Sequence, residues 1–132
     1  MLLLPTGTFF AMRFLLITND DELRLLAREG LHPSDELQTR ANWKEALEAC
    51  ADVDLMFVDL LATLDEPGRI AGYERFAMAK MDHPVASAVP LVLISPPEKY
   101  ELDFMAGWPD FVLGHIQRPV TVKVFRRAST WV

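Results

Sequence analysis

The chain has 132 residues, of which 51% are hydrophobic and 24% charged, and this is the composition of one globular domain rather than of a disordered chain. Its 19 acidic and 13 basic residues give a formal net charge of −6, which argues against direct binding to nucleic acid or to an anionic membrane. The single cysteine, Cys50, excludes an internal disulfide and a cysteine-based zinc site and favours a reducing, cytoplasmic location.

The first eleven residues, MLLLPTGTFFA, are predicted to be an N-terminal extension that precedes a folded domain over residues 12–132. They lack a basic start, and Pro5 and Gly7 interrupt their apolar run, so they do not resemble an export signal. No apolar run in the sequence approaches the roughly 20 residues that a membrane span requires.

Strands and helices are predicted to alternate along the domain. Continuous apolar runs are typical of strands buried on both faces, and they occur at residues 13–17, 54–59 and 90–95. A weaker strand pattern covers residues 37–40, and a fifth strand is predicted over residues 110–116. Helical spacing or helix-capping residues predict helices that end near Gly30, Cys50, Met81, Ala106 and Ser129. Residues 60–71 are predicted to form a long turn.

This alternation predicts an α/β fold, because right-handed crossovers between parallel strands place helices on the faces of a sheet. Five such units in this length favour a flavodoxin-like three-layer sandwich, with a five-stranded parallel sheet in the order 2-1-3-4-5 and helices on both faces. In such folds the site lies beyond the carboxyl ends of the strands.

Three side chains of complementary chemistry follow different predicted strands at that edge. Asp59 ends one strand, Ser95 ends the next and Arg118 follows the last. A carboxylate, a hydroxyl and a cation at one rim could hold a phosphoryl group, with the carboxylate as its acceptor.

The same stretches resemble the receiver domain of two-component response regulators, from about Arg13 to the C-terminus. The resemblance is carried by FLLITNDDELR, DLMFVD, GYE, PLVLIS and QRPV. It implies that residues 12–132 form a receiver-like domain and that Asp59 is the phosphoacceptor for a histidine kinase or phosphotransfer protein, assisted by Mg²⁺. It further implies that Ser95 is the switch hydroxyl and that His115 falls near the switch aromatic, unless His115 is an ordinary surface histidine.

Two departures from the family pattern indicate an atypical receiver or a pseudo-receiver. The family's pair of Mg²⁺-binding acids falls on Thr18 and Asn19, which leaves Asp59, Asn19 and Asp20 as the candidate metal ligands. The family's lysine before proline is Arg118 here.

Several alternatives stay open at these positions. An Asp59–Arg118 ion pair could hold the site in one state, since a guanidinium can clamp a carboxylate in two places. Asp20 and Asp21 are the natural N-cap and first-turn acids of a helix. The Arg118–Pro119 bond is a candidate cis peptide, as in the family's motif.

The resemblance implies a non-enzymatic signal-transduction module with an effector protein or domain as its partner. One alternative is a pseudo-receiver that acts in protein–protein interaction or as a homodimer without phosphorylation, and a more distant one is a small flavodoxin-like ligand-binding protein. The aromatic residues Tyr100, Phe104 and Trp108 form a candidate partner surface, or else cover the edge of the core.

Overall fold

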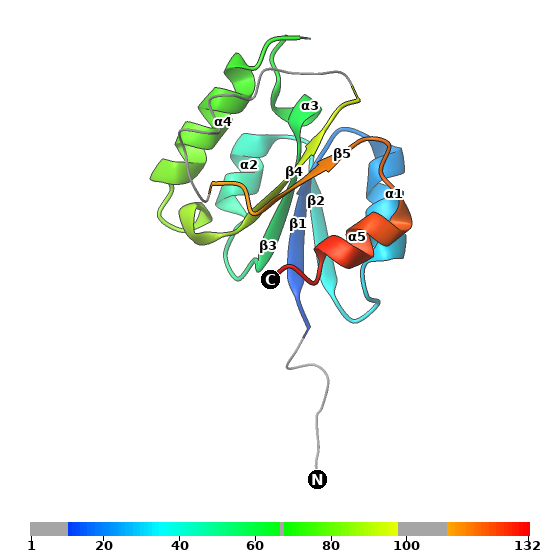
Figure 1. The fold of residues 1–132 in the computed structure, drawn as a ribbon. Helices are drawn as coiled ribbons and strands as arrows, with labels where there is room; N and C mark the ends of the chain where they lie inside the picture. The colour runs from blue at the N-terminus through cyan, green and yellow to red at the C-terminus, as the bar shows by residue number, and fades with distance from the viewer. Residues whose placement is uncertain (1–10, 67, 98–110) are drawn as a thin grey trace.

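A computed structural model describes residues 11–66, 68–97 and 111–132. Within these residues, five parallel strands form one sheet in the order β2-β1-β3-β4-β5 (Figure 1). The strands are β1 (Arg13–Ile17), β2 (Glu36–Arg40), β3 (Leu55–Asp59), β4 (Leu91–Ser95) and β5 (Gly114–Gln117). The predicted flavodoxin-like order is therefore confirmed.

Helices cover both faces of the sheet, as the strand alternation predicts (Figure 1). The helical elements are α1 (Asp21–Gly30), α2 (Trp43–Glu48), α3 (Leu60–Thr63), α4 (Ala71–Asp82), the 3₁₀ turn η2 (Ala86–Ala88) and α5 (Val122–Ala128). Helices α1 and α5 pack on one face, and α2, α3 and α4 lie on the other. Among the described residues, no helix is long and apolar enough to cross a membrane.

The core is divided in two by the sheet, because successive side chains of a strand point to opposite faces. In β1, Leu15 and Ile17 join the cluster beneath α2 and α4, whereas Phe14 and Leu16 join the cluster beneath α1 and α5. Every residue of the central strand β3 is buried, including its last residue, Asp59. The site therefore begins at the end of a strand that is buried along its whole length.

The structure corrects two predictions. The turn predicted after Asp59 starts as the one-turn helix α3, for which Asp59 is the N-cap. Strand β5 begins at Gly114, not at residue 110. Met78 and Met81 lie on the outer side of α4 and are 57% and 42% exposed.

Other predictions concern residues outside the described part of the chain. The helix predicted to end near Ala106 lies there, as do residues 1–10 of the predicted extension. The domain boundary at residue 12 therefore stays a prediction.

Candidate functional site

The Asp59 carboxylate lies at the carboxyl end of β3 with only 3% of its side chain exposed. The hydroxyl of Thr18, which follows β1, donates a hydrogen bond to Asp59 Oδ2 over 2.7 Å. The backbone N–H of Leu61 donates to Asp59 Oδ1 over 3.2 Å. Both carboxylate oxygens are thus engaged by neighbouring segments of the chain.

Arg118 supplies the positive charge of the site. Its Nη2 lies 2.8 Å from Asp59 Oδ2 and its Nη1 lies 3.0 Å from Asp20 Oδ2. The sequence leaves open an ion pair in which Arg118 clamps the Asp59 carboxylate in two places. The structure has this ion pair, but the two arms of the guanidinium bind two different acids. The Nε of Arg118 is buried without a hydrogen-bond partner in the described residues. The predicted cis peptide at Arg118–Pro119 is confirmed.

Asp20 serves two structural roles at once. Its Oδ1 caps α1 by accepting hydrogen bonds from the N–H groups of Glu22 and Leu23, over 2.9 and 3.4 Å, which confirms the capping role expected from the sequence. Its Oδ2 accepts a hydrogen bond from Arg118 Nη1. Burial acts to raise the pKa of Asp20, but the hydrogen bonds from Arg118, Leu23 and Glu22 outweigh it, so this pKa lies below its ordinary value.

Thr18 ties the β1–α1 connection to Asp59. It is fully buried, and its Oγ1 both donates to Asp59 and accepts the backbone N–H of Asp20 over 3.0 Å. Arg24 Nη2 donates to the Thr18 carbonyl over 2.7 Å. Sequence reasoning named Thr18 only as a lost metal ligand and missed its hydrogen bond. The signal available was the position of a hydroxyl-bearing residue directly after a buried strand.

Ser95 ends β4, and its backbone carbonyl accepts the N–H of Arg118 over 2.9 Å. Its hydroxyl lies 2.7 Å from His115 Nε2 on the adjacent strand β5. Among the described residues, this hydroxyl makes no hydrogen bond to Asp59 or Arg118. Ser95 and His115 are therefore brought together beside the site, with His115 largely exposed.

The candidate metal ligands share a pocket of about 290 Å³, lined by Asn19, Asp20, Asp59, Leu61, Ala62 and Arg118. Asn19 is exposed at its rim. Each of the two acids directs one oxygen to Arg118, so the guanidinium supplies the positive charge between them. In the described residues, no group of three or more His, Cys, Asp and Glu side chains could hold a metal. Mg²⁺ keeps several water ligands and needs only one or two protein carboxylates, so Asp20 and Asp59 could hold it only if Arg118 moved away from them.

The candidate partner surface of Tyr100, Phe104 and Trp108 lies outside the described residues. It stays a prediction.

Comparison with known proteins establishes the fold. The chain matches no protein-family model and no curated protein. Many solved structures match it, among them the chemotaxis response regulator CheY4 of Vibrio cholerae, at 17% identity and a TM-score of 0.66, with 90% of this chain and 96% of that chain covered. A CheY-like response regulator receiver domain protein from Methanospirillum hungatei matches at 13% identity and a TM-score of 0.69, with 90% and 91% covered. NtrX from Brucella abortus matches at 20% identity and a TM-score of 0.65, with 90% of this chain and 25% of that chain covered. The chain thus has the fold of response regulator receiver domains, as the sequence resemblance implies.

Proposed function

We propose that this chain is a receiver-type signal-transduction module that binds its partners without phosphotransfer. One observation carries the proposal: Arg118 bridges Asp59 and Asp20, and it holds the candidate phosphoacceptor in an internal ion pair. The module is non-enzymatic and cytoplasmic in this proposal, and its partner is an effector protein or domain or a second copy of the chain.

The chemistry of phosphotransfer explains why this arrangement opposes it. The acceptor oxygen must be free to attack phosphorus, and a metal ion must neutralise the charge that builds up on the phosphoryl oxygens. Here Asp59 Oδ2 accepts hydrogen bonds from Thr18 and Arg118, while Oδ1 accepts one from the backbone N–H of Leu61. A metal ion would have to displace Arg118 from two carboxylates before it could bind.

A second candidate is phosphotransfer to Asp59 from a histidine kinase or phosphotransfer protein. It is favoured by the pocket that opens onto Asp59 next to Asn19 and Asp20. In this mode Asn19, Asp20 and Asp59 would hold Mg²⁺, and Arg118 would turn to the phosphoryl group. The Ser95 hydroxyl would break its hydrogen bond with His115 and form one with the phosphoryl group.

Intact-mass measurement after incubation with acetyl phosphate and Mg²⁺ separates the two candidates. We expect the mass of the wild type to stay unchanged. As a matched positive control, the variant Thr18→Asp/Asn19→Asp/Arg118→Lys restores the family's acids and lysine, and it should gain one phosphoryl group. A gain by the wild type that is absent in Asp59→Asn would overturn the proposal in favour of phosphotransfer.

A further inference from the structure

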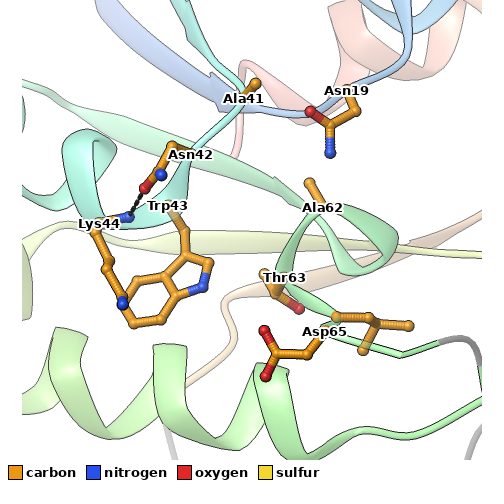
Figure 2. A pocket seen from close by; sticks show the side chains of 9 residues that line it. Asn19, Ala41, Asn42, Trp43, Lys44, Ala62, Thr63 and Asp65 are labelled. Atoms are coloured by element: carbon orange, nitrogen blue, oxygen red, sulfur yellow. Dashed lines mark hydrogen bonds between the residues drawn. The ribbon is translucent and has the colours of Figure 1, made fainter.

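A second pocket, of about 420 Å³, lies beside the Asp59 site between α2 and α3 (Figure 2). Its walls are Asn19 after β1, residues 41–44 at the start of α2, and residues 62–65 in and after α3. It shares Asn19 and Ala62 with the smaller pocket that reaches Asp59. Its volume lies within the range of natural small-molecule sites, about 300–1,000 Å³.

The indole ring of Trp43 forms the fixed wall of this pocket. It is half-buried and packs edge-on against Phe76, with 5.7 Å between the ring centroids. Figure 2 shows the indole nitrogen turned toward Thr63, across the pocket. This N–H can only donate a hydrogen bond, and it has no acceptor among the described residues. The ring therefore offers a flat apolar surface with one unused donor.

The charges around the ring favour an anion. The ammonium of Lys44 lies 5.6 Å from the centroid of the Trp43 ring and forms no ion pair with a carboxylate of the described residues. Asp65, the only acid among the residues that line this pocket, is ion-paired with Arg75. The pocket thus presents a cation and the N–H donor of Trp43, and the exposed ion pair with Arg75 offsets part of the charge of its one carboxylate.

We propose that this pocket binds a small aromatic carboxylate. An aromatic ring would stack against Trp43, and the carboxylate would accept a hydrogen bond from the ammonium of Lys44. Such a ligand would also touch both segments that hold Asp59: Asn19 follows Thr18, and α3 starts directly after Asp59. Its use as a signal input rests on the proposed function, whereas the binding itself does not.

Titration of the full chain with naphthoate, followed in amide proton–nitrogen NMR spectra, tests the proposal. We expect saturable shifts of the Trp43 indole signal and of the backbone amides of Asn19 and Ala62. Naphthamide, which has the same ring and no charge, should bind about fivefold more weakly, since an exposed ion pair contributes up to about 1 kcal/mol. Lys44→Ala should lose the same factor, while Lys123→Ala, its exposed counterpart on α5, should bind as the wild type does.

Three results would overturn the proposal: no saturable shift at millimolar naphthoate, equal affinity for naphthamide, or equal affinity of Lys44→Ala and Lys123→Ala. Trp43→Phe keeps a ring without the N–H donor, and the dispersion of its spectrum reports folding in the same experiment. It should remain folded and bind more weakly. The NMR titration measures ligand binding at Trp43, whereas the acetyl phosphate experiment measures phosphorylation of Asp59. A negative result in one experiment therefore does not change the conclusion from the other.

Discussion

The guanidinium of Arg118 is the charge partner of a carboxylate that is almost fully buried. Deleting one member of a buried ion pair leaves the other uncompensated and typically costs about 3–5 kcal/mol. We therefore expect Arg118→Met to lower the free energy of unfolding by about 3 kcal/mol in urea denaturation. Adding Asp59→Asn removes the stranded charge and should recover more than half of that loss. Arg28→Met, at an exposed position of α1, is the matched control, and an equal effect of the two arginine substitutions would contradict this role.

Lys80 is the only lysine or arginine that is buried in the described part of the chain, and it lies outside the Asp59 site. Only 3% of it is exposed, on the inner face of α4, and its Nζ donates to the carbonyl of Val89 over 2.8 Å. The same Nζ lies 5.5 Å from the centroid of the Phe111 ring. Desolvation disfavours the ammonium and lowers the pKa of Lys80.

This lowered pKa predicts a stability that depends on pH. At a pH between the pKa of Lys80 in the folded state and its ordinary value, Lys80 is protonated in the unfolded chain and deprotonated in the folded chain. The free energy of unfolding therefore rises with pH across this window, by at most about 1.4 kcal/mol per pH unit. Lys80→Met lacks this titration, so the stability of the parent relative to the variant should increase from neutral to alkaline pH.

Both proteins of that comparison are best measured in a Cys50→Ala background. Burial raises the pKa of the Cys50 thiol, and its titration would contribute with the opposite sign. A difference in unfolding free energy that stays constant with pH would show that the Lys80 ammonium is not disfavoured in the folded state.

At the scale of elements, the contact between α3 and α4 depends on the absence of a side chain at Gly72. A Cβ there would lie 2.2 Å from the carbonyl oxygen of Thr63 and 2.9 Å from the backbone nitrogen of Asp65. Glycine-to-alanine changes inside helices usually stabilise by about 0.5–1 kcal/mol. Here we expect the opposite sign, a loss of about 1–3 kcal/mol, because backbone atoms must move apart. Met78→Ala, on the exposed side of α4, should change the unfolding free energy by less than about 0.5 kcal/mol in the same urea series, and a stabilised Gly72→Ala would contradict the close approach.

The elements that the sequence predicts best are those with a long, regular pattern. The apolar runs of β1, β3 and β4 are typical of parallel strands that are buried on both faces. Helix α3 has four residues, too few for any periodicity, and it depends on Asp59 as its N-cap. The predicted start of β5 is too early because Phe111 and Val112 continue its apolar run, whereas both side chains pack against the cluster beneath α2 and α4 before the strand begins.

At the scale of the whole molecule, topology predicts the site more securely than its contacts. The strand order alone brings Asp59, Ser95 and Arg118 to one edge, as the sequence indicates. It does not show that Asp20 shares the guanidinium, because that hydrogen bond joins residues 98 positions apart. Nor does it show that the Ser95 hydroxyl turns to His115. Such choices among polar partners depend on side-chain geometry, which a pattern of apolar residues does not encode.

The central claim is that the chain's own arginine takes the place of a metal ion between two carboxylates. A crystal structure determined with Mg²⁺ and beryllofluoride, a mimic of the phosphoryl group, tests it most directly. We predict that Arg118 still bridges Asp20 and Asp59 and that neither metal nor beryllofluoride is bound at Asp59. A structure with Mg²⁺ coordinated by these two acids, beryllofluoride on Asp59 and the guanidinium displaced would contradict the claim.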